Sequence, residues 1–419
     1  MRSWNTTHAN LVDPEFWVRP PAEVDAEIAR LHAEAPLDWF EELMPEDSIL
    51  SAGPGYWSVT RHADIAEVSR RADVFSSAAG ITVTDTPDEF REFFSSMIAM
   101  DDPRHARLRR LVAKGFTPKM LAELEGSVQG IAAQIVDDIG PRGRCDFVTD
   151  VAARLPLKIV CDLMGIPDSQ YDFVFDRTNI ILGIGDPEFQ PEGVDFITAL
   201  ITAGAELAQL MNEVAESKKG GDGTDLTSVL VNAELEDDQL TDSDLASFFI
   251  LLVVAGNETT RNAISWGLDY LTKHPDQRAL WASDFEGHAQ GAVEEIVRLA
   301  SPVTYMRRTV MRDVELGGQQ LLEGDKVCMF YLAANRDPSV FDDPLRFDIT
   351  REPNQQYGFG GPGPHFCLGA HLARREITVM FRELFERIPD IHSVSEPDVL
   401  LSAFIHGVKH LDAEFTPVS

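Results

Sequence analysis

The chain has 419 residues and a formal net charge of −33, from 69 acidic and 36 basic side chains. A surface this acidic repels polyanions, which argues against nucleic acid or anionic lipid as partners. The four cysteines show no paired spacing, so neither a zinc site nor a disulfide scaffold is indicated. The first residues lack the apolar core of a signal peptide, and the longest strongly apolar run, residues 248–255, is far below the roughly 18 residues that span a bilayer. We therefore expect a cytoplasmic protein without a membrane span.

Length alone favours two domains, but no repeat, low-complexity tract or linker divides the chain. We predict one domain over residues 1–419, mainly α with a small β-rich portion at roughly 51–60 and 303–332. In chain order, the pattern is helix-like with prolines up to residue 50, then favours a strand at 56–60 and a helix at 64–71. Further helices are predicted at 119–138, 148–164, 244–273 and 292–300.

Residues 358–369 carry the most unusual composition of the chain. Four glycines and two prolines precede Cys367, and a helix-period apolar pattern follows it. Glycines allow a close approach of the backbone to a ligand. A cysteine at the start of a helix lies near unpaired N–H groups, which lowers the thiol pKa below its free value of about 8.5. The sequence therefore predicts a thiolate on a glycine-rich loop.

Four interpretations of this loop compete. Cys367 could be an ordinary buried cysteine, since free cysteines are usually buried. The glycines formally match a dinucleotide fingerprint, but the polar residues 351–356 cannot form the strand that must precede it. A Cys367/His365 nucleophile pair is poorly placed, because residues two apart on an extended loop point to opposite faces. The fourth interpretation is a single thiolate ligand of a haem iron.

Residues 254–260 place an acid and two hydroxyls inside an apolar helix. Gly256 would let a broad group lie against the backbone. Thr259 could hydrogen-bond back to a carbonyl, and Glu258 beside a hydroxyl and a water is an arrangement for proton delivery. The alternative is a helix turn whose polar face reaches solvent, which the following Arg261 and Asn262 support.

Several dispersed groups add to this. Glu295 and Arg298 share a helix face at i, i+3, and His105 and Arg109 share one at i, i+4. Each of these residues alone is typical of a solvated side chain. Together with His365 and with Arg308, which lies in a strand-like run, the cationic and donor groups could bind the carboxylates of a flat anionic cofactor.

These five motifs follow one another along the chain in the order of the cytochrome P450 family of haem-thiolate monooxygenases, and the chain resembles that family over essentially its whole length. The resemblance implies heme b with Cys367 as the iron ligand, Glu258 and Thr259 as catalytic groups, and Glu295 with Arg298 as a structural pair. It also implies a set of cofactor-binding residues: His105, Arg109, Ala255, Gly256, Arg308, Phe359, Gly360, His365, Cys367 and Gly369. Either Arg346 or Arg351 would complete the Glu295/Arg298 network.

The chain departs from the family pattern at one position. The usual phenylalanine stands seven residues before the cysteine, but here Gly360 holds that place and Phe359 stands one earlier. The spacing is similar to that of a mycobacterial subgroup that oxidises sterols and methyl-branched lipids. That resemblance implies an apolar pocket lined by Ile81, Phe94, Met97, Leu182, Val254, Ala255, Val303 and Phe404.

The resemblance also implies the reaction, in which one atom of O₂ enters an unactivated C–H bond of an apolar lipid near its terminus. Since no flavin or iron–sulfur segment is present, we expect electrons from a ferredoxin and its NAD(P)H-dependent reductase, docking on basic residues around Lys114, Arg374 and Arg375. The protein is expected to be a monomer. A peroxide-driven peroxygenase and a non-catalytic haem-thiolate sensor are the alternatives, and both have less need of the Glu258–Thr259 pair.

Overall fold

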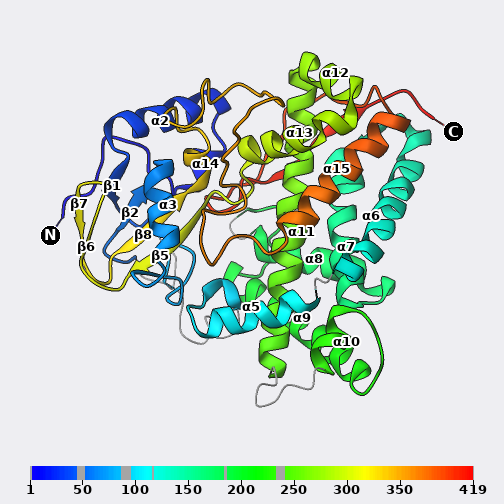
Figure 1. Cartoon of the computed structure of the whole chain (residues 1–419), viewed down its shortest axis with the longest axis horizontal. Coiled ribbons are helices and arrows are strands. Elements are labelled where there is room, and N and C mark those ends of the chain that lie inside the picture. Colours follow the sequence, from blue (N-terminus) through cyan, green and yellow to red (C-terminus); the bar gives the residue numbers. More distant parts are fainter. Residues whose placement is uncertain are drawn as a thin grey trace. The chain divides into compact units, whose positions relative to one another are not determined.

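Two compact units make up the fold (Figure 1). The computed structural model describes residues 2–44, 52–85, 96–115, 118–183, 186–232 and 241–418. The first unit takes its described residues from Met1–Ala106, Glu286–Leu368 and Leu401–His406, and the second from Arg107–Phe285, Gly369–Leu400 and Gly407–Ser419. The expected single domain over the whole chain remains a prediction.

The first unit is built on a five-stranded sheet in the order β1-β2-β8-β5-β3. Strands β2 and β8 pair in parallel, with Trp57 opposite Val327, and the other neighbours pair antiparallel. The strands are β1 (Leu37–Phe40), β2 (Tyr56–Val59), β3 (Phe75–Ser76), β5 (Tyr305–Val310) and β8 (Lys326–Phe330). A separate hairpin joins β6 (Val314–Leu316) and β7 (Gln319–Leu321).

Strand β8 shows how the sheet is held. All five of its residues are buried. Val327 and Met329 belong to the core cluster that contains α3, whereas Cys328 and Phe330 belong to the cluster that contains α2. Since side chains alternate along a strand, an apolar run buried on both faces needs a cover on each side. The helices of this unit are α1 (Pro14–Trp17), α2 (Pro21–Glu34), α3 (His62–Arg70), α13 (Phe285–Ala300), α14 (Tyr331–Ala334) and the short η1 (Met97–Ala99).

The second unit is organised around α11 (Asp242–Lys273), which packs against α7, α9 and α15 (Figure 1). A capping box starts α11: the Asp244 N–H donates to the Thr241 hydroxyl at 3.0 Å, and the Thr241 N–H donates back to the Asp244 carboxylate at 3.1 Å. The other helices are α6 (Pro118–Ile139), α7 (Arg154–Met164), α8 (Tyr171–Leu182), α9 (Phe196–Lys218), α10 (Leu226–Val231), α12 (Pro275–Ser283) and α15 (Ala370–Arg387). Helix α5 (Arg104–Gly115) begins in the first unit and continues in the second.

Two small sheets complete the second unit. The strands β4 (Arg144–Asp146), β12 (Asp412–Glu414) and β9 (His392–Ser393) form one, and β10 (Asp398–Val399) and β11 (Val408–His410) form the other. No helix among the described residues has an apolar stretch long enough to cross a bilayer.

The fold is mainly α with small sheets, as predicted, and α11 matches the predicted long helix 244–273 closely. The expectation of helix throughout 13–50 was wrong at β1, and the predicted helix 148–164 begins with a π turn over Val148–Ala152. Helix α9 was not predicted. Its mixture of alanines and β-branched residues gives a weak periodic signal, and packing against α8 and α11 stabilises it instead.

Candidate active site

Cys367 lies on a tightly folded loop two residues before Gly369, the N-cap of α15. The Cys367 N–H donates to the carbonyl oxygen of Phe359 at 3.0 Å, and the Gly360 N–H donates to that of Tyr357 at 2.8 Å. Gly360 has a φ of 88°, a left-handed conformation that favours glycine. The residue that follows Phe359 is therefore absorbed in a turn, and Phe359 itself contacts the cysteine backbone.

The glycines of this loop serve different purposes. A Cβ on Gly358 would lie 2.6 Å from Val297 Cγ1, and a Cβ on Gly361 or Gly363 would collide with Ser69 of α3. By contrast, a Cβ on Gly369 would meet no heavy atom of the described residues within 4 Å. The expectation that a glycine-rich loop lies against a ligand therefore needs correction, since three glycines serve packing within the first unit, and Gly360 and Gly369 remain as open positions.

Cys367 differs from the other three cysteines in its exposure. Cys145, Cys161 and Cys328 are buried, whereas Cys367 is exposed. Burial raises the pKa of the Cys145 and Cys161 thiols to about 12 and raises that of Cys328 as well. Burial therefore favours the protonated form of these three thiols near neutral pH and shields them from a ligand, whereas Cys367 is accessible. This distinguishes Cys367 from an ordinary buried cysteine.

Two histidines predicted to bind a cofactor meet in the first unit. The rings of His105 and His365 lie 4.2 Å apart, centroid to centroid, and the Ser77 hydroxyl lies 3.1 Å from His365 Nε2. Asp101 orders this corner, because it accepts the Ser77 N–H at 2.8 Å and its carbonyl oxygen accepts the His105 N–H at 2.9 Å. Neither Ser77 nor Asp101 was predicted from the sequence, although Asp101 stands one helical turn before His105.

Arg308 on β5 is a buried cation, only 5% exposed. Its hydrogen bond among the described residues goes to the Arg307 carbonyl oxygen at 2.7 Å, and no described carboxylate lies within ion-pair distance. Burial lowers the pKa of this guanidinium, because the charged form loses hydration. A buried charge normally has a partner, so the site fits an anionic group of a bound cofactor. Arg109 is half-buried one turn after His105 on α5.

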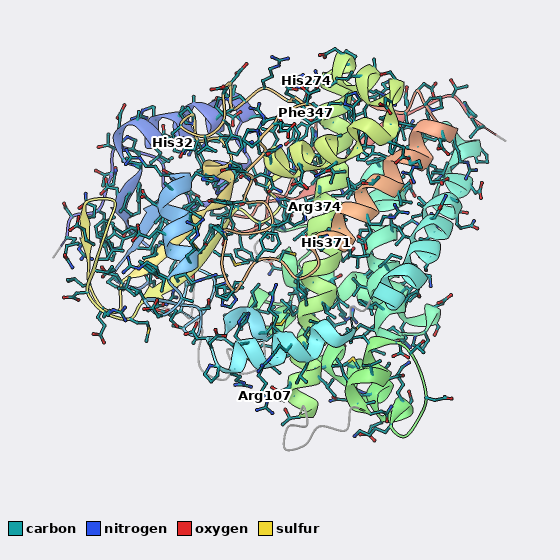
Figure 2. All side chains as sticks on the ribbon, in the orientation of Figure 1. His32, Arg107, His274, Phe347, His371 and Arg374 are labelled. Atoms are coloured by element: carbon teal, nitrogen blue, oxygen red, sulfur yellow. The ribbon has the colours of Figure 1, made fainter. Side chains whose placement is uncertain are left out.

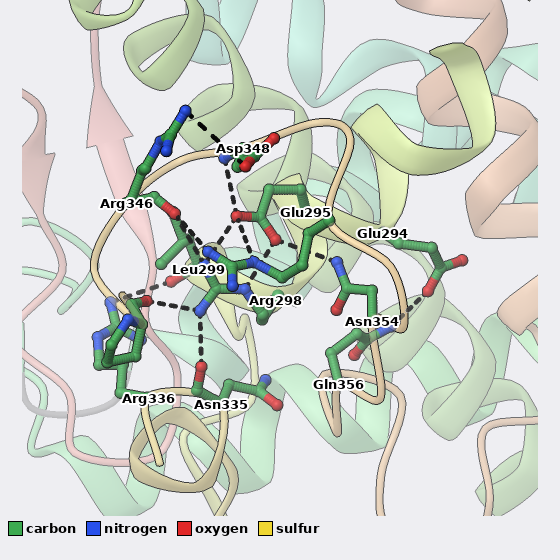
Figure 3. A network of polar contacts seen from close by, with 12 residues as sticks. Glu294, Glu295, Arg298, Leu299, Asn335, Arg336, Arg346, Asp348, Asn354 and Gln356 are labelled. Atoms are coloured by element: carbon green, nitrogen blue, oxygen red, sulfur yellow. Dashed lines mark hydrogen bonds and ion pairs between the residues drawn. The ribbon is translucent and has the colours of Figure 1, made fainter. Parts of the chain in front are cut away.

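Glu295 and Arg298 form a buried ion pair on α13 (Figure 3). Arg298 Nε and Nη2 donate to the two Glu295 carboxylate oxygens at 2.7 Å each, which makes the pair bidentate. Arg298 Nη1 also donates to the carbonyl oxygen of Asn335 at 2.7 Å. Neither side chain is exposed, so this is not a surface pair. Asn354, which donates to Glu295 Oε2 at 3.0 Å, was missed by the sequence analysis.

The acid and the alcohol of α11 have separate environments in the second unit. Thr259 Oγ1 donates to the Ala255 carbonyl oxygen at 2.7 Å, and Ala255 is exposed although it lies in the middle of a long helix. Glu258 is 1% exposed and pairs with Arg261, with Asn262 Nδ2 3.4 Å from the same oxygen, Oε1. Arg261 and Asn262 are themselves buried, so the interpretation of a turn facing solvent was wrong.

Gly256 does not face open space. A Cβ on this residue would lie 2.8 Å from Val160 Cγ2 of α7. The missing side chain therefore allows α11 and α7 to pack closely, and the expectation that a broad ligand lies against Gly256 on its side-chain face needs correction. The exposed neighbour Ala255 is the position on this turn that leaves room for a ligand.

The residues expected to line a substrate pocket fall in both units. In the first unit, backbone contacts bring three of these residues to the start of β5. The Thr304 N–H donates to the Phe404 carbonyl oxygen at 2.9 Å, and Val303 forms a β-bridge with Ile405. The Arg307 N–H donates to the Ile81 carbonyl oxygen at 2.7 Å. Met97 is buried on η1. In the second unit, Val254 is half-buried beside Ala255. Phe94 and the side chain of Leu182 lie outside the described residues.

The chain matches the family model described as Cytochrome P450 over residues 196–280 and 289–388. It is 47% identical over 400 residues, or 95% of this chain and 92% of the relative, to the methyl-branched lipid omega-hydroxylase of Mycobacterium tuberculosis. It is 36% identical to the steroid C26-monooxygenase of Mycolicibacterium smegmatis over 93% of this chain and 90% of the relative. A Mycobacterium marinum cytochrome P450 in complex with pseudoionone is 39% identical, with a TM-score of 0.94 over 99% of this chain and all of that one.

The chain belongs to the cytochrome P450 family. It is a cytochrome P450 monooxygenase, and the P450 family implies a haem-thiolate iron cofactor, O₂ and redox partners. In the first unit the described residues fit such a cofactor at two points, namely the exposed Cys367 and the buried Arg308, which has no carboxylate partner among them.

Proposed function

We propose that this P450 binds heme b with the Cys367 thiolate on the iron, and that the propionates are held by His105, Arg109, Arg308 and His365. The observation that carries the assignment is that Cys367 is the exposed cysteine of the four and lies at the start of α15. When bound, the haem would supply oxygen activation, which a thiolate ligand favours. Phe359, Gly360, Gly369 and Ala255 would lie along its faces, and Gly256 would contribute only by keeping α11 close to α7.

Glu258 and Thr259 would deliver protons during the reaction. Thr259 Oγ1 already donates to the Ala255 carbonyl, so its lone pairs are left to accept a proton or a water. Glu258 has its Oε1 held by Arg261 and Asn262 and its Oε2 without a partner among the described residues. An acid with one fixed oxygen and one open oxygen is suited to proton transfer in a defined direction.

The substrate would be a methyl-branched fatty acid, an isoprenoid or a sterol side chain, oxidised at or near its terminus. Two relatives named for omega-hydroxylation and C26 oxidation support this assignment, and so does the apolar character of Val303, Phe404, Ile81 and Val254. Hydroxylation at a chain end requires that the chain enters lengthwise, and a narrow apolar site would exclude a substrate presented side-on.

Electrons would come from a ferredoxin with its NAD(P)H-dependent reductase. Basic side chains on α5 and α15 would dock the acidic ferredoxin despite the overall charge of −33. Figure 2 marks Arg107 on α5, and His371 and Arg374 one turn apart on α15. Charge reversal of Arg374 together with Arg375 should slow reduction and leave lipid binding unchanged, and unchanged reduction rates would contradict this docking site.

The lipid assignment is tested by titrating the purified haem protein with a panel of lipids of matched length. Methyl-branched fatty acids and sterols should give a substrate-type shift of the haem absorption band at lower concentrations than straight-chain acids. Product analysis by mass spectrometry should then place the new hydroxyl at the chain end. A panel without any shift, or hydroxylation in mid-chain, would contradict the assignment while leaving the family membership unaffected.

A further inference from the structure

Four buried polar atoms without a partner cluster on one stretch of α11. Asn257 is 0% exposed, and neither its Nδ2 nor its Oδ1 has a hydrogen-bond partner among the described residues. The same holds for Oε2 of Glu258 and for Nε of Arg261. Nearly all buried polar groups in proteins are hydrogen-bonded, so a cluster within five successive positions needs a physical explanation.

The positions of these residues on the helix define one polar surface. Asn257 and Arg261 share a face at i, i+4, and Glu258 pairs with Arg261 at i, i+3. Thr259 and Ala255 share another face, where the threonine hydroxyl is bonded to the Ala255 carbonyl. Glu258 therefore lies between an inner polar face, which contains Asn257, and the face that carries Thr259.

Both partners of Glu258 Oε1 are anchored by other elements. Arg261 Nη1 donates to Asn179 Oδ1 on α8 at 2.9 Å, and Asn262 Oδ1 accepts the Val408 N–H of β11 at 3.0 Å. The carboxylate is thus held at Oε1 and cannot turn without breaking these contacts. Oε2 is left as the oxygen at which a proton can be exchanged.

We propose that Asn257 is a positioning residue for proton delivery, and that its side-chain amide holds an ordered water against Oε2 of Glu258. An amide offers both donors and an acceptor, and a buried water typically makes about three hydrogen bonds to polar groups that lack other partners. A proton on Oε2 would move to a water bonded to the Thr259 hydroxyl, and Oε2 would take another from the water held by Asn257. That water accepts a proton from solvent as its own O–H bond breaks, so no hydroxide is left in the buried site.

This inference rests on the proposed role of Glu258 and adds the source from which Glu258 is reprotonated. It also explains why a buried asparagine is used at a position where leucine would pack at lower cost. An asparagine without a bonded partner would destabilise the helix bundle, whereas one that holds a water against Glu258 serves the reaction.

The test compares Asn257→Leu, Asn257→Ser and Glu258→Gln, with Ser247→Ala as a control for loss of a buried hydroxyl elsewhere on α11. Asn257→Leu should bind lipid as the wild type does but convert electrons to product about tenfold less efficiently, since general acid–base steps contribute about 10²-fold or more. Asn257→Ser should recover part of this loss, and Ser247→Ala should show none. A high-resolution crystal structure of the wild type should show a water bonded to both Asn257 and Oε2.

Two results would overturn the inference: unchanged coupling of electrons to product in Asn257→Leu, or a crystal structure in which the Asn257 amide is bonded to protein groups alone. The Glu258→Gln variant separates the two proposals. If it couples normally, the role of Glu258 itself is wrong. If it loses coupling and Asn257→Leu does not, only the role of Asn257 is wrong.

Discussion

The Nε atom of Arg351 donates to Oε1 of Glu295 at 3.2 Å. Arg351 therefore completes the buried Glu295/Arg298 network, and Arg346 does not. Arg346 contributes its carbonyl oxygen, which accepts from Arg298 at 3.1 Å and from Arg351 at 3.0 Å, while its own guanidinium is exposed beside Asp348 (Figure 3). Two arginines five residues apart thus have opposite roles, one through its side chain and one through its backbone.

This difference provides a matched pair of variants. Arg351→Met removes one charged donor from the buried Glu295 carboxylate, which keeps Arg298 and Asn354, and a lost hydrogen bond to a charged group costs about 1.5–3 kcal/mol. We expect a large decrease in the free energy of unfolding in urea, together with poor haem retention. Arg346→Gln keeps the carbonyl oxygen in place and should change stability by less than about 0.5 kcal/mol, as surface substitutions usually do. Equal effects of the two variants would contradict the assignment.

The cysteine loop is predicted to tolerate no side chain at Gly363. A Cβ there would collide with the carbonyl oxygen of Ser69, a backbone atom that cannot move aside. Gly363→Ala should therefore destabilise the protein by about 1–3 kcal/mol, in the range of overpacking, and should displace the loop that carries Cys367. The measurement is thermal unfolding with haem content.

Gly130→Ala on α6 is the control for this variant. A Cβ on that glycine would meet no heavy atom within 4 Å in the part of the chain that the structure describes, and alanine in place of glycine in an exposed helix interior stabilises by about 0.5–1 kcal/mol. If the unfolding temperature of Gly363→Ala is as high as that of Gly130→Ala, the cysteine loop does not pack tightly against α3 and the prediction is wrong.

The sequence was sufficient for features set by neighbouring residues. The helix after Cys367, the length of α11 and the Glu295/Arg298 pairing all depend on spacings of a few residues. The choice between Arg346 and Arg351 depends on how residues 342–354 fold back onto α13, which periodicity does not encode. The glycines of the loop show the same limit, because a glycine that packs on Ser69 and one that leaves room for a ligand look alike in sequence.

Glu376 of α15 makes stability depend on pH. Burial raises the pKa of this carboxyl to about 8 from its ordinary value of 4.5. Between these values the unfolded chain loses the proton while the folded chain keeps it, so stability falls by about 1.4 kcal/mol per pH unit across that window and levels above it. Glu376→Gln should remove this slope in urea unfolding followed from pH 5 to pH 9.

Glu386, an exposed carboxyl further along α15, provides a control variant for this pH dependence. Glu386→Gln should retain the slope of the wild type. A Glu376→Gln protein with the same pH dependence as the wild type would show that this carboxyl titrates normally.

Strand β11 is predicted to tether the connection between α8 and α9. Lys409 Nζ lies 3.3 Å from Asp186 Oδ2 and 3.2 Å from Glu188 Oε2, and His410 Nε2 lies 2.8 Å from Glu188 Oε1. Hydrogen bonds to Asp146 and Glu188 raise the pKa of His410. The charged contact of His410 with Glu188 is therefore present at low pH and is lost as the pH rises through the pKa of His410 in the folded protein.

Hydrogen exchange in the substrate-free protein measures this tether. The amide protons of residues 186–194 should exchange faster in Lys409→Gln than in the wild type. In the wild type, their exchange rate should increase with pH more steeply than the intrinsic rate of an unprotected amide. Lys219→Gln, which removes a surface pair with Glu216, is the control. Protection of residues 186–194 that is equal in both variants would contradict the tether.

The acid–alcohol segment shows where sequence reasoning fails in the second unit. The composition of residues 254–260 predicts a functional turn, which stays a prediction, whereas Arg261 and Asn262 favoured a surface that faces solvent. They are buried because Asn179 of α8 and Val408 of β11 bind them, and these partners lie 82 and 146 positions away. Long-range contacts of this kind decide whether a charged residue is a solvated side chain or part of a site.

The absorption spectrum of the reduced, carbon-monoxide-bound protein shows whether Cys367 is the thiolate ligand of a haem iron. We expect the band that is specific to thiolate-ligated haem, its loss in Cys367→Ala and its retention in Cys145→Ala. A spectrum of the histidine-ligated type, or a protein that remains colourless when haem is supplied, would contradict the claim.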